Sequence, residues 1–229
     1  VNKTMWLEEA KREKLMTILT GWIRAAKRGR NGIAFEEFRS VTAKIRHAFT
    51  CTPQGVAFLS PVNRILRAAP PRVYLHKNER LLQAIKACRT LLRESFKEPT
   101  RCRELTSGWP DFVGIVDASS HGVGGVVFGE GSKCIPTAFR WQWPEDITND
   151  VKSLTNPNGR ITNSDLEMAG MLLAWIVIEE VGGDLKEKSI SLLGDNTPSI
   201  SWIDKLASRQ SRVAEQLVQA LAIRMKANK

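Results

Sequence analysis

The second half of this 229-residue sequence has an order of strand and helix patterns that limits the folds open to it. Apolar or alternating runs bounded by turn residues predict strands, and longer periodic segments predict helices. The expected strands are 112–116, 124–128, 135–143 and 189–193, and the expected helices are 164–181, 198–206 and 209–226. The order β-β-β-α-β-α-α predicts an α/β fold with a mixed sheet. In that sheet an antiparallel meander is followed by a right-handed crossover to a strand parallel to the first.

The third expected strand alternates aromatic and polar residues. Phe139, Trp141 and Trp143 share one face, and Arg140 and Gln142 share the other. The aromatic row could stack on nucleic-acid bases, or it could form a half-buried face against a helix. The second arrangement is the more frequent one for strands of this composition.

Residues 1–108 are predicted to form a separate helical segment. Three apolar stripes recur there at three- and four-residue steps, as in helices that pack one face on a core. The stripes are Leu15, Leu19, Trp22 and Ala26; then Phe35, Phe38, Val41 and Ile45; and then Leu81, Ile85, Cys88 and Leu92. The sequence around Pro53 and Pro61 is expected to be a connection. Gly108 and Pro110 mark the boundary to a second domain, residues 109–229.

The two halves differ in charge. Residues 1–110 contain 22 Lys/Arg and 9 Asp/Glu, a net charge of +13, and residues 111–229 contain 12 and 15, a net charge of −3. Together they give the +10 of the chain. Because basic side chains that meet phosphates release counterions, the basic half favours a nucleic acid as partner. A solvated basic surface is the alternative, and no single Lys or Arg is assigned a contact.

The composition excludes several classes of protein. With 42% hydrophobic and 25% charged residues, the chain does not resemble a disordered sequence. No apolar run approaches the roughly 18–20 residues of a membrane span, and no secretory leader is recognisable. The cysteines lack the paired spacing of a zinc site and are expected to be reduced thiols of an intracellular protein, cytoplasmic or nuclear, with no membrane partner. They are Cys51, Cys88, Cys102 and Cys134.

Three acidic residues lie at the ends of expected elements. Asp117 follows the first strand, Glu167 lies in the first turn of the helix, and Asp195 follows the fourth strand. If the first and fourth strands are parallel neighbours, Asp117 and Asp195 lie side by side, where open α/β sheets bind ligands. A helix across the sheet can bring Glu167 to the same edge. Three adjacent carboxylates repel one another unless a cation neutralises them, and oxygen ligands suit Mg²⁺ or Mn²⁺.

Each acid also has a structural interpretation. Glu167 stands third after Ser164, the spacing of a capping box. Asp195 could belong to a turn and helix cap, with Pro198 at the first helical position. Asp117 could form the turn between the first two strands. Glu167 could be both a cap and a ligand.

Three segments resemble the ribonuclease H domain of retroelement reverse transcriptases of the LTR and DIRS types. They are DASSHGVGGVV (117–127), NSDLE (163–167) and DNTPSISW (195–202). The resemblance covers about residues 111–227. A weaker one links residues 35–41 and 60–63 to the thumb or connection segment that follows the polymerase palm.

This resemblance implies a ribonuclease H-like fold and hydrolysis of the RNA strand of RNA/DNA hybrids. In the family, two divalent ions share the scissile phosphate; one activates a water and the other stabilises the leaving oxygen. Carried over, Asp117 would bridge the two ions, Glu167 would help to hold one and Asp195 the other. The hybrid would be recognised through backbone and 2′-hydroxyl contacts. The basic helices would add phosphate contacts, and the rest of a polymerase polyprotein would be a further partner.

The sequence departs from the family after Asp195. The family has a fifth strand and a last helix with a fourth acid, but the sequence reaches Lys229 without a match to either. Asp204 does not have the position of that acid. A C-terminally truncated domain, part of a longer polyprotein without its palm, is therefore expected.

Two other functions remain open from the residues alone. One is a catalytically inactive ribonuclease H-like module that binds nucleic acid or acts as a scaffold. The other is an actin-like or sugar-kinase-like nucleotide fold, in which the glycines after Asp117 cradle a phosphate. A glycine-rich turn is weak evidence for the latter, and the chain is too short for its duplicated domain.

Overall fold

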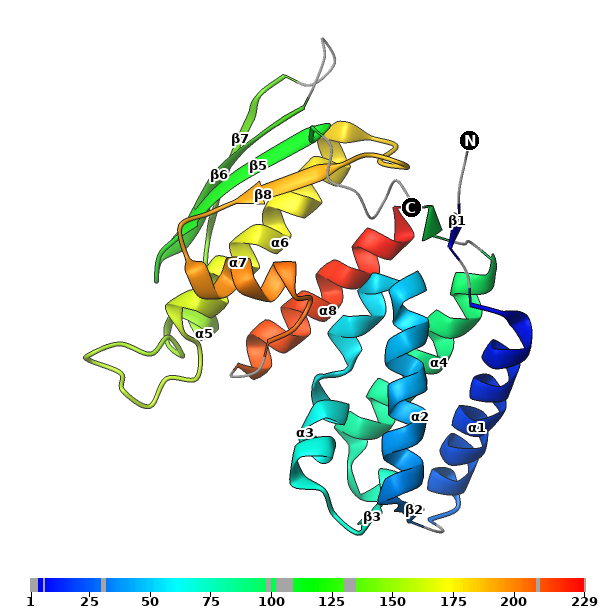
Figure 1. The fold of residues 1–229 in the computed structure, drawn as a ribbon. Helices are drawn as coiled ribbons and strands as arrows, with labels where there is room; N and C mark the ends of the chain where they lie inside the picture. Colours follow the sequence, from blue (N-terminus) through cyan, green and yellow to red (C-terminus); the bar gives the residue numbers. More distant parts are fainter. Residues whose placement is uncertain are drawn as a thin grey trace. The chain divides into compact units, whose positions relative to one another are not determined.

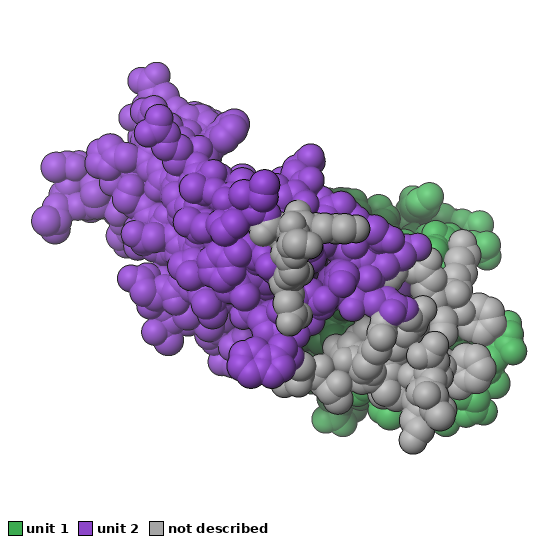
Figure 2. All heavy atoms as spheres, turned by 90° about the horizontal axis from the view of Figure 1, so that it is seen from above, with its two compact units in different colours: residues 1–105 green, residues 106–229 purple. Residues whose placement is uncertain are grey.

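The computed structural model describes residues 4–5, 7–29, 32–97, 100–101, 109–129, 135–208 and 211–228. The chain divides into two compact units, Val1–Leu105 and Thr106–Lys229, which Figure 2 shows in different colours. The boundary expected from the sequence, between residues 108 and 109, lies three residues further along the chain. Cys102 and Cys134 lie outside the described residues, whereas Cys51 is half-buried and Cys88 is a buried free thiol.

The first unit is helical, as its apolar stripes predict (Figure 1). Its helices are α1 (Glu9–Lys27), α2 (Phe35–Ala48), α3 (Ser60–Ala68) and α4 (Glu79–Lys97), with 3-10 turns at Phe49–Cys51, Pro53–Phe58 and Leu75–Lys77. The stripes of α1 and α4 are buried throughout, and that of α2 is buried from Phe38 onward. These side chains form the core of the unit.

Two features of the first unit differ from the expectation. The connection around Pro61 contains α3, because proline fits the first turn of a helix, and Pro61 is here the second residue of one. Two strand pairs also occur: β1 (Thr4–Met5) with β4 (Thr100–Arg101), and β2 (Ile33–Ala34) with β3 (Arg72–Val73). Strands of two residues are too short to show an alternating pattern in the sequence.

The second unit has a mixed four-stranded sheet in the order β7-β6-β5-β8. Its strands are β5 (Phe112–Ala118), β6 (Gly122–Gly129), β7 (Thr137–Gln142) and β8 (Ile190–Leu193). β5, β6 and β7 pair antiparallel, and β8 runs parallel to β5. The predicted α/β class and the parallel pairing of the first and last strands are therefore confirmed.

Helix α6 (Asn163–Gly182) covers one face of this sheet (Figure 1). Met171, Ala174 and Ile178 of the helix are buried in one core cluster with Val116 and Val127 of the strands. The close approach requires a glycine at position 170, since a Cβ there would lie 2.8 Å from Val116. This packing fixes the depth at which the first turns of α6 meet the sheet edge.

Three further helices complete the unit: α5 (Glu145–Thr148), α7 (Thr197–Asp204) and α8 (Arg212–Ala227). α8 packs against α6, and α5 lies between β7 and α6. Among the described helices, none has the combination of length and apolar composition that a membrane span requires.

The opposite face of the sheet is exposed at three apolar positions, Ile115, Val126 and Leu193. The aromatic row of β7 only partly follows the expectation. Trp143 is buried and Phe139 packs against the core, but Trp141 is 60% exposed because β7 is an edge strand.

Candidate metal centre

Asp117 is the next-to-last residue of β5 and pairs with Gly124 of β6. The turn that follows is built by Ser119, not by the aspartate. The Ser119 N–H donates to the Gly122 carbonyl at 2.8 Å, and its Oγ accepts from the His121 N–H at 3.2 Å. Trp143 holds the same turn by donating its ring N–H to the Ser119 carbonyl at 2.8 Å. The turn-forming interpretation of Asp117 is therefore wrong, and its carboxylate is left exposed at the strand end.

Glu167 is the fifth residue of α6 and takes no part in capping the helix. The capping box is formed by Thr162 and Asp165. The Asp165 carboxylate accepts from the Thr162 N–H at 2.8 Å, and the Asp165 N–H donates to the Thr162 hydroxyl at 3.3 Å. The helix thus begins two residues earlier than the Ser164–Glu167 box requires, and that interpretation is wrong. One turn into the helix, Glu167 faces the sheet edge.

Asp195 lies two residues beyond β8, before α7. The cap of α7 is Asn196, whose side-chain oxygen accepts from the Ser199 N–H at 3.0 Å. Pro198 is the second residue of the helix, not the first as expected. Asn196 caps α7, so the Asp195 carboxylate takes no part in the cap. The Asp195 side chain is exposed.

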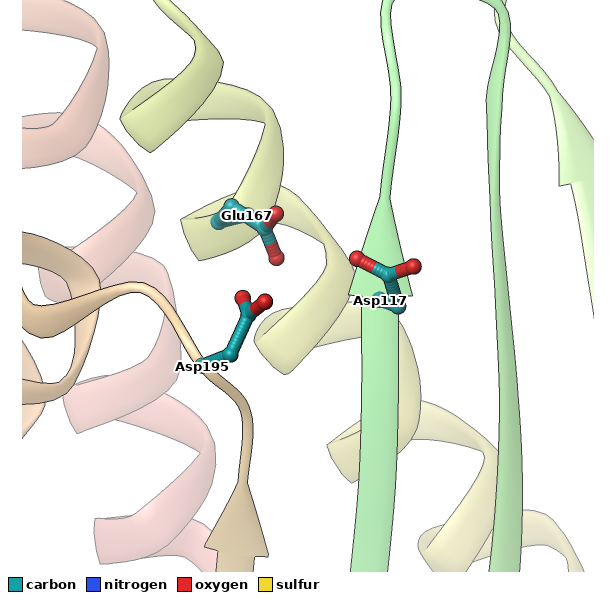
Figure 3. A group of neighbouring side chains, drawn as sticks. All are labelled: Asp117, Glu167 and Asp195. Atoms are coloured by element: carbon teal, nitrogen blue, oxygen red, sulfur yellow. The ribbon is translucent and has the colours of Figure 1, made fainter.

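The three carboxylates converge at the carboxyl ends of β5 and β8, as Figure 3 shows. One oxygen from each of Asp117, Glu167 and Asp195 lies within 4.8 Å of those of the other two. The parallel register explains this, because Ile115 and Leu193 are paired and each aspartate lies two residues further along. We call these three residues the acidic cluster.

Glu167 has the least favourable environment of the three. It is 2% exposed, and within the described part of the chain its Oε2 has no hydrogen-bond partner. Burial raises the pKa of Glu167, and the neighbouring charges of Asp117 and Asp195 raise it further, against a hydrogen bond from the Ala118 backbone that lowers it. A buried charged oxygen is costly without a partner. A positive charge at the cluster would therefore stabilise the ionised carboxylates.

The donor set fits a hard divalent cation. All ligand atoms of the cluster are carboxylate oxygens, the donors that Mg²⁺, Mn²⁺ and Ca²⁺ prefer, and neither histidine nor cysteine is among them. Three carboxylates leave coordination positions for water or a phosphate oxygen. The cluster could thus hold a metal ion, with its orphaned Glu167 oxygen as a ligand.

A groove adjoins the cluster on the exposed face of the sheet. It measures about 810 Å³, and Asp117, His121, Gly124, Arg140 and Gln142 are among its lining residues. Arg140 was not among the expected site residues, and Gly124 was considered only as one of the glycines that could cradle a phosphate in a nucleotide fold. The feature that identifies both residues is the pairing register of the strands, which aligns Asp117, Gly124 and Arg140 across β5, β6 and β7.

No protein-family model and no curated protein matches the sequence. The fold and the site together define an α/β unit with a mixed four-stranded sheet. A three-carboxylate centre able to bind a divalent ion lies at the sheet's edge.

Proposed function

We propose that the second unit is a ribonuclease H-like domain that hydrolyses the RNA strand of RNA/DNA hybrids, as part of a retroelement reverse transcriptase. The observation that carries this proposal is the acidic cluster, with its buried and unpartnered Glu167 oxygen. Such an arrangement costs stability in the absence of a cation, so a bound Mg²⁺ or Mn²⁺ gives it a physical reason.

The topology is compatible with this assignment. An antiparallel meander, a helix across one face and a strand parallel to the first are the elements that the family resemblance implies. The three acids on these elements are those of the motifs at 117–127, 163–167 and 195–202.

In this function the exposed Asp117 and Asp195 and the buried Glu167 would hold the ion. A bound divalent ion supplies an acidified water and neutralises charge on phosphoryl oxygens. Helix α6 and the two strands fix the positions of the carboxylates, so that little reorganisation is needed when substrate binds. The exposed sides of both aspartates leave room for a phosphodiester.

The basic first unit supports a nucleic-acid substrate. Its part of the sequence carries the excess of Lys and Arg, and side chains such as Lys14 and Lys44 lie on exposed faces of their helices. These residues would contact phosphates of the hybrid, with affinity that falls as salt rises.

Cleavage of a labelled RNA/DNA hybrid in Mg²⁺ tests the proposal, with Asp117→Asn as the variant. We expect cleavage by the natural chain and a loss of about 10²–10³-fold in the variant, the scale of removing a catalytic electrostatic partner. Asp204→Asn is the matched control, because this exposed aspartate ends α7 outside the cluster. Its activity should equal that of the natural chain.

Equal cleavage by the natural chain and Asp117→Asn would overturn the catalytic assignment. If neither protein cleaves but both bind the hybrid with a steep salt dependence, the inactive binding module replaces the enzyme as the function.

A further inference from the structure

The groove beside the acidic cluster runs across three strands of the exposed sheet face. Asp117 pairs directly with Gly124, and Gly124 pairs directly with Arg140. Directly paired residues point to the same face, and neighbouring strands lie about 4.8 Å apart. Asp117 and Arg140 therefore stand at two sides of the groove, about 10 Å apart across the strands, with Gly124 between them.

The glycines of β6 differ in what the protein requires of them. A Cβ at Gly122 would lie 2.5 Å from the Trp141 carbonyl oxygen, and one at Gly125 would lie 2.6 Å from the Ile115 carbonyl oxygen. Both positions need glycine for packing. A Cβ at Gly124 would meet only the Phe139 carbonyl oxygen, at the ordinary contact distance of 3.7 Å.

Nothing within the described structure thus explains the glycine at position 124. Its φ angle is not positive, so the backbone does not demand glycine either. Glycine weakens a strand, and one without an internal reason often marks a place where a ligand approaches the backbone closely. Gly124 lines the groove, so the missing side chain keeps the space between Asp117 and Arg140 open.

Arg140 gives this space a preference for anions. Its side chain is exposed and forms no ion pair with a described carboxylate. The remaining walls include the hydrogen-bonding side chains of Ser119, His121 and Gln142. The Arg140 guanidinium can bind a phosphate, and the polar side chains can hydrogen-bond to a sugar. Gly124 leaves the bottom of the groove between them free of a side chain.

We propose that this groove binds the sugar-phosphate backbone of the strand whose phosphate reaches the acidic cluster. Gly124 lets the backbone lie against β6, and Arg140 contacts a neighbouring phosphate. The inference rests on the proposed function, because it takes the hybrid as the ligand.

The test measures the Kd of a labelled RNA/DNA hybrid for the full chain in Ca²⁺, over a series of salt concentrations, and separately the Mg²⁺-dependent cleavage rate. Arg140→Gln should weaken binding about tenfold and lower the salt slope by about one, as expected for one lost phosphate contact. Lys186→Gln is the matched control, since it removes an exposed cation from the same unit outside the groove. Its Kd should stay unchanged.

Gly124→Val tests whether the absence of a side chain at position 124 is needed for binding. Valine favours strands and has space for its Cβ, so the variant should unfold at the same or a higher urea concentration than the natural chain. We nevertheless expect its Kd for the hybrid to rise about tenfold or more, because the side chain would fill the groove.

The outcomes separate this inference from the proposed function. If the natural chain cleaves the hybrid but Arg140→Gln and Gly124→Val bind like Lys186→Gln, the groove is not the binding site and the enzymatic proposal stands. If the natural chain binds the hybrid and both groove variants weaken it, the groove is supported even where cleavage is absent. Failure of the natural chain to bind the hybrid overturns both.

Discussion

Two carboxylates near the start of α6, those of Asp165 and Glu167, are both buried. They differ in how many hydrogen bonds the protein supplies to them. At the α6–α8 junction, formed by Thr162, Asp165 and Ala214, Asp165 is 1% exposed. Its oxygens accept from the Thr162 N–H at 2.8 Å, the Thr162 hydroxyl at 2.7 Å and the Ala214 N–H at 3.2 Å. In the acidic cluster, Glu167 is equally buried, but one of its oxygens has no described partner and two carboxylates face it.

The contrast separates a structural acid from a candidate functional one. Burial is the same, so burial alone does not distinguish them. What differs is whether protein donors complete the hydrogen bonds of the carboxylate. Asp165 is complete without a ligand and joins two helices, whereas one Glu167 oxygen has no described partner and could be completed by a bound cation.

The largest expected effect is on catalysis, from Glu167→Gln. Cleavage of the hybrid should fall about 10²–10³-fold, because the amide supplies a weaker ligand to the ion. In EDTA the same variant should be at least as stable to urea as the natural chain, since it removes a repelling charge. Glu180→Gln, on the exposed side of the same helix, is the control for both measurements. A variant that kept full activity would mean that Glu167 holds no catalytic ion.

Asp165→Asn should have the opposite profile. The amide nitrogen can accept neither Thr162 hydrogen bond if the oxygen stays with Ala214, so the free energy of unfolding should drop by about 2–3 kcal/mol. Urea denaturation measures this loss. Stability equal to that of Glu167→Gln would remove the distinction between the two regions.

Mg²⁺ should stabilise the second unit against heat. An ion that binds only the folded state adds about 2.7 kcal/mol at a hundred times its Kd. The melting temperature should therefore rise with Mg²⁺ in the natural chain and much less in Asp117→Asn. A parallel rise in both would place the ion away from the acidic cluster.

The smallest effect is on pH dependence in EDTA. Because the folded-state pKa of Glu167 is raised above its ordinary 4.5, this group favours folding most below that pH and loses its contribution as pH rises through the folded pKa. The Asp111 pKa is lowered, chiefly by the Ser189 N–H, so its contribution is present above 3.8 and is lost as pH falls. Subtracting the urea curves of Glu167→Gln and Asp111→Asn from that of the natural chain should give slopes of opposite sign.

The sheet and the meeting of the two aspartates were predictable from the sequence. Apolar runs ending at Asp117 and Asp195, with one long helix between them, allow few arrangements other than parallel neighbours. The location of the helix start was not predictable. Thr162, Asn163, Ser164 and Asp165 can all cap a helix, and Ala214, 49 residues from Asp165, contributes the contact that completes the observed cap.

The environment of Glu167 and the free space above Gly124 could not be predicted from the sequence either. Whether a carboxylate oxygen is orphaned depends on how closely α6 packs on β5. Likewise, the sequence does not distinguish the three glycines of β6 at positions 122, 124 and 125. Only the distances from their Cβ positions to neighbouring strands show at which of them the packing requires glycine.

The parallel pairing of β5 with β8 also has a kinetic consequence. Asp117 and Asp195 are 78 residues apart in the chain (195 minus 117), so the cluster depends on one of the most non-local contacts of the unit. Contacts of high sequence separation form late, after local hairpins and helices. A chain that has folded only the β5–β7 meander and α6 would hold two of the three acids. High-affinity ion binding should therefore report completion of the fold, and refolding followed by metal binding should lag behind the appearance of helix.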